Sequence, residues 1–216
     1  MIFPAIKCLK IKRVILVIGC SVFLQAMAKS QSNTLPHLVS RGTAKQLIVH
    51  DNPFLVLGGE LGNSSASSLD YMRPVWEKLT TMHLNTVLIP VYWELMEPEE
   101  GKFDFALIDS LLNSSRDHHL KVVLLWFGLW KNNMSCYAPS WVKTNQSRFP
   151  RAQDQSGKGL EILSAFSKNN LDVDIKAFTA LMKHIRATDK SHTVIMMQVE
   201  NEIGMLTEAI IQILNT

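Results

Sequence analysis

The sequence predicts an α/β fold with a parallel sheet, organised as the first four βα units of a (β/α)8 barrel. Short apolar runs alternate with segments of helical periodicity in the order βαβαβαβ, which implies parallel strands joined by helical crossovers. Polar or aromatic residues follow each expected strand, as they do where barrel strands converge around one axis. These strand-end residues are Glu60, Trp93 with Glu94, Trp126, and Asn201 with Glu202. An open doubly wound sheet also fits the alternation, but no G-x-G-x-x-G motif opens the first helix, so a dinucleotide fold would lack its phosphate loop.

The composition is that of an ordinary globular protein, with 216 residues that are 47% hydrophobic and 19% charged. The net charge is only +3, and much of it lies in the first 13 residues. Because no basic stripe occurs elsewhere, nucleic-acid binding has little support. The histidines are scattered along the chain, so no metal-ligand cluster is expected.

Residues 1–28 have the pattern of a signal peptide. A basic start precedes the apolar run 14–24, and Ala26-Met27-Ala28 resembles a cleavage site. This predicts export to the periplasm or the extracellular space. Two alternatives remain: residues 17–20 resemble a lipobox in which Cys20 would be lipidated, or the segment stays uncleaved as an anchor. Cleavage after Ala28 would leave Cys136 as the only thiol, which excludes an internal disulfide.

The mature part divides into a polar lead-in segment, 29–44, and the half-barrel, 45–216. Two short strands are expected at 46–50 and 54–59, separated by a turn. The second of them is apolar throughout, as a buried parallel strand would be. A mostly irregular stretch with several aromatic residues is expected at 128–171. The remaining expected elements are helices at 69–82, 104–119 and 172–188 and strands at 86–91, 121–127 and 193–199.

Helical spacing of apolar residues supports each of these three helices. The first carries Asp70 in its first turn, where an acidic side chain favours the helix dipole. The apolar positions are Leu69, Met72, Trp76 and Leu79 in the first helix, Phe105, Ile108, Leu111 and Leu112 in the second, and Ile175, Phe178, Leu181, Met182 and Ile185 in the third. Trp76, on a helix face, is expected in the core.

The segment Glu200-Asn201-Glu202 follows the last expected strand and ends before Gly204. Glycoside hydrolysis needs two carboxyl groups, of which one donates a proton and the other attacks or activates water. Glu202, with Glu200 close in sequence, could be a proton donor with a raised pKa. In an extended strand Glu200 and Glu202 share one face and Asn201 lies on the other, so the strand must twist or bulge if both Asn201 and Glu202 are to reach a substrate. The alternative is that the two glutamates form structural ion pairs.

Several segments resemble glycoside hydrolase family 35, the β-galactosidases. Residues 198–204 resemble that family's acid/base motif, and residues 93–105 resemble its W-x-x-x-E-P-x-x-G-x-F-D-F segment. Residues 54–60 fit its first strand, and 125–166 are similar to a bacterial branch. The similarity runs from about Lys45 to Met205.

The resemblance implies a retaining exo-β-galactosidase that hydrolyses terminal β-galactosyl residues of oligosaccharides or polysaccharides. By that resemblance Glu202 is the general acid/base, Asn201 bonds the sugar hydroxyl next to the anomeric carbon, and Glu200 is a supporting polar group. The implied pocket-lining residues are Glu60, Asn63, Tyr92, Trp93 and Glu94. Glu94 stands where many family members have Asn, which leaves the sugar contacts at that position open.

Aromatic side chains after the third strand are candidate sugar platforms, because their faces can stack on the C–H faces of pyranose rings. The candidates are Trp126, Trp130, Tyr137 and Trp141. Core packing is the alternative, and for Trp126 and Trp130 we expect the pocket. Glu97 is expected to be a structural anchor, and Glu99 and Glu100 are expected to be solvated.

A complete (β/α)8 barrel takes roughly 250 residues, and the family's nucleophile glutamate lies on a later strand than any in this chain. We therefore expect the chain alone to be inactive and to self-associate through open sheet edges. Two-carboxylate chemistry requires no cofactor. The alternatives are a non-catalytic or vestigial carbohydrate-binding fragment, and a related barrel glycosidase that acts on β-glucosides or β-mannosides.

Overall fold

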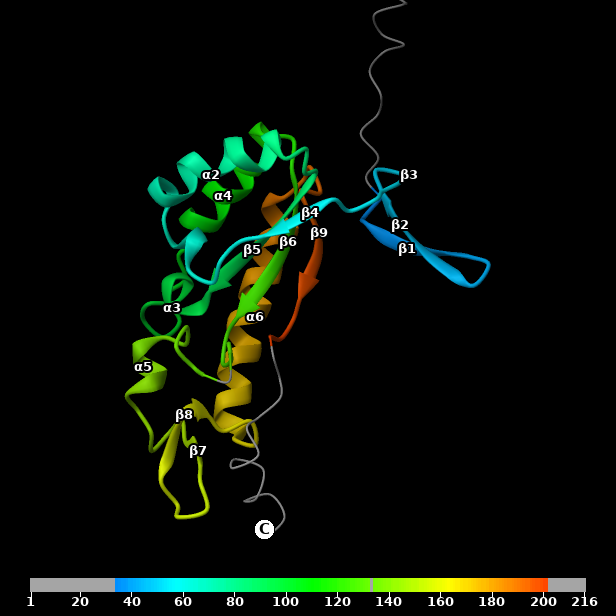
Figure 1. The fold of residues 1–216 in the computed structure, drawn as a ribbon. Coiled ribbons are helices and arrows are strands. Elements are labelled where there is room, and N and C mark those ends of the chain that lie inside the picture. Colours follow the sequence, from blue (N-terminus) through cyan, green and yellow to red (C-terminus); the bar gives the residue numbers. More distant parts are fainter. Residues whose placement is uncertain (1–33, 133, 202–216) are drawn as a thin grey trace, which may run out of the picture.

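A computed structural model of the protein describes residues 34–132 and 134–201. Its centre is a sheet of four parallel strands in the order β4 (Gly58–Glu60), β5 (Thr86–Tyr92), β6 (Lys121–Phe127) and β9 (Val194–Gln198). Helices α2 (Leu69–Thr81), α4 (Ala106–Asp117) and α6 (Lys168–Thr188) connect consecutive strands (Figure 1). The predicted βαβαβαβ order and the parallel sheet are thus confirmed. The strand order never reverses, so the described sheet has no topological switch point of the kind found in open doubly wound folds.

Local sequence explains where the helices begin. The Ser68 hydroxyl accepts a hydrogen bond from Tyr71 N at 3.2 Å, and Ser167 does the same for Asn170 N at 3.3 Å. Asp104 caps the start of α4 by accepting from Ala106 N at 2.8 Å. As predicted, Met72, Trp76 and Leu79 of α2 and Ile108, Leu111 and Leu112 of α4 are buried.

The buried face of α6 differs from the predicted one. Leu181 and Ile185 are buried, but Ile175 and Met182 are exposed. The buried positions are Asn170, Val173, Asp174, Ala177, Leu181 and Ile185. Two of these are polar, so a prediction from hydrophobic residues alone rotates the helix away from its true face.

The N-terminal part forms a small antiparallel sheet of three strands. The lead-in segment includes strand β1 (His37–Arg41), which pairs antiparallel with β2 (Ala44–Val49), and β2 pairs with the two-residue strand β3 (Asn52–Pro53). Gly42, at φ 60°, makes the turn between β1 and β2.

The strand expected at 54–59 is largely absent, because only β4 at its end is a strand. The Asn85 side chain accepts from Leu57 N at 2.9 Å and donates to Leu55 O at 2.8 Å. It thereby takes the backbone bonds that a neighbouring strand would otherwise make. The apolar side chains of Leu55 and Leu57 are exposed.

The stretch 128–171 contains structure that its sequence did not reveal. It forms the short helix α5 (Ser140–Lys143) and an antiparallel hairpin of β7 (Arg151–Gln153) and β8 (Gly159–Leu163). The Asp154 carboxylate accepts from Ser156 N at 2.8 Å and Lys158 N at 3.0 Å, which closes the hairpin turn. Two further short elements are η1 (Ser65–Ser67) and α3 (Trp93–Met96).

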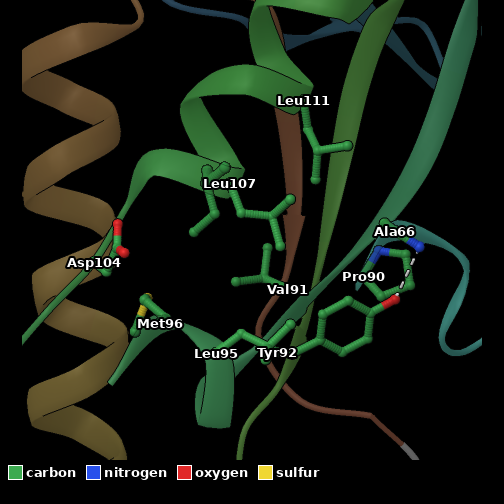
Figure 2. A pocket seen from close by; sticks show the side chains of 10 residues that line it. Ala66, Pro90, Val91, Tyr92, Leu95, Met96, Asp104, Leu107 and Leu111 are labelled. Carbon is green, nitrogen blue, oxygen red and sulfur yellow. Dashed lines mark hydrogen bonds between the residues drawn. The ribbon is translucent and has the colours of Figure 1, made fainter. Parts of the chain in front are cut away.

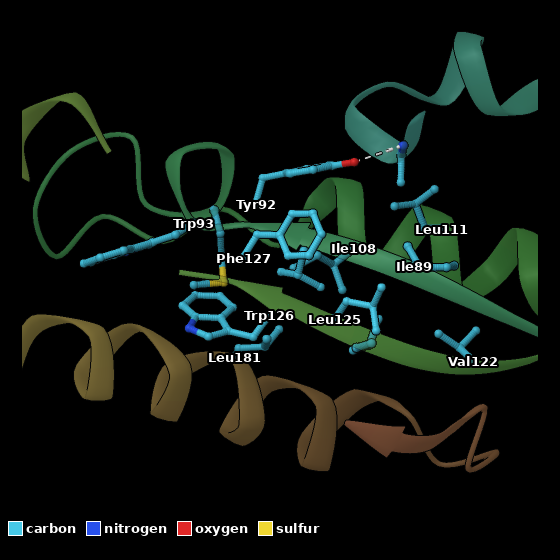
Figure 3. Packing of buried hydrophobic residues seen from close by; sticks show 14 of the residues in the cluster. Ile89, Tyr92, Trp93, Ile108, Leu111, Val122, Leu125, Trp126, Phe127 and Leu181 are labelled. Carbon is cyan, nitrogen blue, oxygen red and sulfur yellow. Dashed lines mark hydrogen bonds between the residues drawn. The ribbon is translucent and has the colours of Figure 1, made fainter. Parts of the chain in front are cut away.

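The main core lies between the sheet and the helices. Val91 is in register with Trp126 and Ile89 with Leu124, and all four side chains are buried. Figure 3 shows Trp126 and Leu181 between the strands and helix α6. The Trp126 ring meets Phe178 of α6 edge to face, with centroids 5.8 Å apart.

Several predictions fall outside the described residues. They concern the signal peptide at 1–28, the first part of the lead-in at 29–33, and Glu202 with the residues that follow it. Within residues 34–132 and 134–201, no helix is long and apolar enough to cross a membrane.

Candidate active site

An aromatic cluster of Tyr92, Phe127 and Tyr137 lies at the carboxyl ends of β5 and β6. The Tyr92 ring centroid is 6.1 Å from that of Phe127 and 5.2 Å from that of Tyr137. The Tyr92 hydroxyl accepts from Ala66 N at 3.2 Å (Figure 2), and burial raises the pKa of this phenol well above its usual range. The Tyr137 hydroxyl lies 2.8 Å from Ser64 Oγ. The aromatic cluster therefore joins the ends of two strands to the loop after β4.

The pocket beside Tyr92 is too small for a sugar. Its lining, shown in Figure 2, is mostly apolar and comes from β5, α3 and α4. Its volume is about 20 Å³, which is room for about one water molecule. This pocket is therefore not a sugar-binding site.

Glu94, which stands where many family 35 members have Asn, is fixed by contacts of its side chain and its backbone. Its Oε2 lies 3.2 Å from Lys143 Nζ, and its backbone N–H donates to Tyr137 O at 2.9 Å. Lys143 also donates to Cys136 O at 2.7 Å. The Glu94 carboxylate is thus placed next to the aromatic cluster and partly neutralised.

Trp93 does not line a pocket, which corrects the sequence-based expectation. It is fully buried and donates its indole N–H to Glu97 Oε2 at 2.7 Å. Glu97 also accepts from Gly101 N at 2.7 Å, and its backbone oxygen accepts from Trp141 Nε1 at 3.0 Å. The expected role of Glu97 as a structural anchor agrees with these contacts.

Trp126 is likewise a packing residue, whereas Trp130 is half-buried. Trp126 is fully buried against α6, where its indole N–H donates to Asp174 Oδ1 at 3.1 Å. Trp130 donates to Leu163 O at 3.1 Å and packs against Ile162 of the hairpin. The interpretation of Trp126 as a pocket residue is corrected, because its indole is fully buried, while that of Trp130 stays a prediction.

The ends of β4 and β9 carry the other predicted site residues. Glu60 ends β4 and is exposed, as is Asn63 in the following loop. Asn201 is buried, and its Oδ1 has no hydrogen-bond partner among the described residues. Strand β9 ends at Gln198, so Glu200 and Asn201 lie in the segment that follows the strand.

Glu200 faces an acid that sequence reasoning missed, Asp174 of α6. The two carboxyl groups lie close enough for each to shift the pKa of the other. Burial, followed by the nearby Asp174, raises the pKa of Glu200 to about 7, and burial raises the pKa of Asp174 to about 6. The available signal was a polar residue within a stripe spaced like a buried helix face, at 170, 174, 177 and 181.

No group of three or more His, Cys, Asp or Glu side chains that could hold a metal occurs among the residues that the structure describes.

A parallel sheet with polar groups gathered at its carboxyl ends is the arrangement of barrel glycoside hydrolases. The family model for the β-galactosidases of glycoside hydrolase family 42 matches residues 69–212, two thirds of the chain. The chain belongs to this family. The resemblance to family 35 is therefore corrected at the level of the family, while the assignment to a family of β-galactosidases is confirmed. An Asn-Glu pair after a strand is shared by many barrel glycosidases, so that motif could not separate the two families.

Solved structures of glycosidases are also similar to the chain. The match to Gan42B, a GH42 β-galactosidase, has 17% identity and a TM-score of 0.52. It covers 71% of this chain and 22% of that one. The β-galactosidase from Rahnella sp. R3 matches with 18% identity and a TM-score of 0.49 over 60% of this chain and 19% of that one. The exo-β-1,4-mannosidase Op5Man5 from Opitutaceae bacterium strain TAV5 matches with 16% identity and a TM-score of 0.45 over 62% and 23%.

At these identities the likeness shows the fold alone, and only the Gan42B match is close enough to support it. The chain spans about a fifth of the length of these structures. A search of curated protein sequences found no match.

Proposed function

We propose that this chain forms the acid/base half of the active site of a retaining exo-β-galactosidase. The observation that carries the proposal is the buried Asn201 at the end of β9, whose Oδ1 has no partner among the described residues. A buried amide oxygen without a partner is costly, and a ligand hydroxyl would satisfy it. In a β-galactosidase family that ligand is a sugar.

In the proposed reaction Asn201 accepts a hydrogen bond from the sugar hydroxyl next to the anomeric carbon. Glu202, the next residue, protonates the departing glycosidic oxygen and later removes a proton from water. A second carboxylate attacks the anomeric carbon, and it lies outside the first four βα units. Glu60, Asn63, Glu94 and the half-buried Tyr137 line the approach to the sugar, while the buried rings of Tyr92 and Phe127 support Tyr137.

The proposed substrates are β-galactosides of oligosaccharides or polysaccharides. The signal-peptide pattern at 1–28 supports action outside the cytoplasm. The exposed apolar side chains of Met196 and Val199 at the β9 edge support self-association of the chain, which sedimentation at several concentrations would test.

The first test is galactoside binding. We expect Asn201→Ala to weaken binding of methyl β-galactoside about tenfold, the effect of losing one hydrogen bond worth about 1.4 kcal/mol. The measurement is an NMR titration of the 216-residue chain. Asn113→Ala is the matched control, because Asn113 is an exposed asparagine of α4, near the opposite ends of the strands. Unchanged binding in the Asn201→Ala variant would contradict the proposed contact between Asn201 and the sugar.

The second test is hydrolysis by the enzyme of which this chain is proposed to be the acid/base half. Glu202→Gln should lower kcat about 10²–10⁴-fold for galactosides with poor leaving groups, and much less for activated aryl galactosides. Equal losses for both substrate types would contradict the acid role. Parallel assays with aryl β-glucosides and β-mannosides identify the sugar, and turnover of either in preference to the galactoside would replace the proposed specificity.

A further inference from the structure

A compact cluster joins helix α6 to the ends of β6 and β9. Its members are Asp174 of α6, Trp126 and Gly128 at the end of β6, and Glu200 after β9. Asp174 is only 5% exposed, and its Oδ1 accepts from Trp126 Nε1 at 3.1 Å. The backbone of Leu129 also favours the ionised form of this carboxylate.

Gly128 shows how closely the cluster is packed. A Cβ at this position would lie 2.2 Å from Asp174 Oδ1 and 2.2 Å from Trp126 Nε1. No side chain fits in that space, so the carboxylate lies directly against the backbone of the β6 end. The position of Asp174 is therefore fixed by the fold.

The partner of this fixed carboxylate is another acid. Glu200 Oε2 is buried and finds no hydrogen-bond donor among the described residues. Two carboxylates in contact inside a protein cannot both be ionised without a large repulsion, but one shared proton turns the contact into a hydrogen bond. The indole N–H of Trp126 and the backbone of Leu129 favour the ionised form of Asp174, so the proton belongs on Glu200.

Among the described residues, no cation acts on either carboxyl of the pair. Within the described part of the chain, the groups that act on Asp174 are Trp126, Leu129 and Glu200, and the group that acts on Glu200 is Asp174. Asn170, one turn earlier on α6, directs its amide to Pro150 O and Ser164 O instead. The pair therefore depends on its own proton.

We propose that Asp174 and Glu200 are positioning residues that share one proton and thereby clamp the end of β9 to helix α6. The clamp holds Asn201 at the strand end, where the proposed substrate binds. When the shared proton is lost, repulsion releases the strand end. The consequence for galactoside binding rests on the proposed function, but the clamp itself does not.

The direction of the pH effect follows from linkage. Both folded-state pKa values lie above their ordinary values, at about 6 for Asp174 and about 7 for Glu200. The folded protein therefore binds more protons than the unfolded chain between about pH 4 and pH 7, and the stability gained from the pair is lost as the pH rises through that range. Because the two groups interact, the apparent values belong to the pair.

The decisive experiment is a carboxyl ¹³C NMR titration of the 216-residue chain. We expect two buried carboxyls to titrate in coupled steps near pH 6 and pH 7. In Glu200→Gln one step disappears and the other moves to lower pH, because the remaining carboxylate gains an amide donor and loses its like-charged neighbour. Titration of both carboxyls near pH 4 in the wild-type chain would overturn the clamp.

Thermal unfolding between pH 5 and pH 8 gives an independent measurement. From pH 5 to pH 8 the Tm of the wild type should fall by several degrees more than the Tm of Glu200→Gln. In that variant the amide donates to Asp174 at every pH. Asp174→Asn should behave like Glu200→Gln, since its amide can donate to the Glu200 carboxylate, whereas Asp174→Ala should have a low Tm throughout. Asp172→Asn, an exposed acid on the same helix, should keep the wild-type pH dependence. Identical pH dependence in wild type and Glu200→Gln would reject the shared proton.

Galactoside binding separates this proposal from the proposed function. Wild-type affinity for methyl β-galactoside should weaken several-fold from pH 6 to pH 8, while that of Glu200→Gln stays constant. A chain with the coupled titration but no galactoside binding would keep the clamp and reject the proposed function. A chain that binds galactoside but has ordinary carboxyl titrations would reject the clamp and keep the proposed function.

Discussion

Helix α6 carries a buried aspartate at its C-terminal end, Asp189, and another, Asp174, in its N-terminal half, and the two have opposite surroundings. Asp189 lies beside the start of β9 and accepts from Arg116 Nη1 at 3.2 Å, Thr193 N at 3.0 Å and Val194 N at 2.8 Å. Asp174 lies at the other end of β9 and meets a second acid, Glu200.

The difference matches the two ends of a parallel α/β sheet. In barrels the amino ends of the strands serve stability and the carboxyl ends carry function. The aspartate at the amino end is fully paired, while at the carboxyl end burial raises the pKa values of two acids. Perturbed acids of this kind are typical of functional sites, where unfavourable charge is maintained for chemistry or for positioning.

The largest effect on stability is expected for Asp189→Ala, which tests the comparison at the amino end of the sheet. It leaves two backbone N–H groups without their acceptor and removes the only carboxylate paired with Arg116 among the described residues, so the free energy of unfolding should fall by about 3 kcal/mol. Urea unfolding at pH 7 measures the change. Asp172→Ala on the same helix removes an exposed pair with Lys168 and should cost less than about 0.5 kcal/mol. A loss below about 1 kcal/mol at Asp189 would mean that the amino end is not the stability-bearing end.

The next effect concerns the packing around Asp174. Gly128→Ala inserts a Cβ at 2.2 Å from both Asp174 Oδ1 and Trp126 Nε1, so the contact must open at a cost of about 2 kcal/mol. The same unfolding assay measures it. Gly159→Ala is the control, since its Cβ would meet only Arg151 Cβ at 3.8 Å. Equal stability of the two variants would show that the cluster is loosely packed.

The same comparison shows which parts of the molecule the sequence could predict. Strand β6 was expected at 121–127 and is found there, because its apolar run is too short for a typical helix and contains β-branched and aromatic residues. Helix α6 was expected in the right place, but its buried face was set by Asn170 and Asp174, which hydrophobic periodicity ignores.

The candidate site was predictable only in part. The sequence placed Asn201 and Glu200 at a strand end, which the fold confirms. It could not show that Trp126 points to α6, because whether a residue faces the helices or the barrel axis depends on strand register. It also could not reveal the Asp174–Glu200 contact, which joins residues that are distant along the chain.

A smaller effect is expected for Trp126→Phe. The ring can still pack against Phe178, but Asp174 loses its indole donor, so stability should fall by about 1 kcal/mol and the pKa of Asp174 should rise further. Trp141→Phe is a matched comparison, because it removes an indole bond to Glu97 O. It should cost a similar amount without moving the Asp174 titration. A shift of that titration in both variants would assign it to general loosening of the fold.

The smallest effect should come from the aromatic cluster. Tyr137→Phe removes the hydroxyl that bonds Ser64 but keeps the ring contacts with Tyr92 and Phe127. Because Ser64 is exposed, water can replace the lost bond, and the free energy of unfolding should change by about 0.5 kcal/mol or less. If galactoside affinity falls while stability is unchanged, this hydroxyl contributes to the sugar site at the strand ends. If the free energy of unfolding instead falls by more than about 1 kcal/mol, the loop after β4 depends on this hydroxyl. The carboxyl end of the sheet would then contribute to stability as well, and the contrast between the two ends would be weaker.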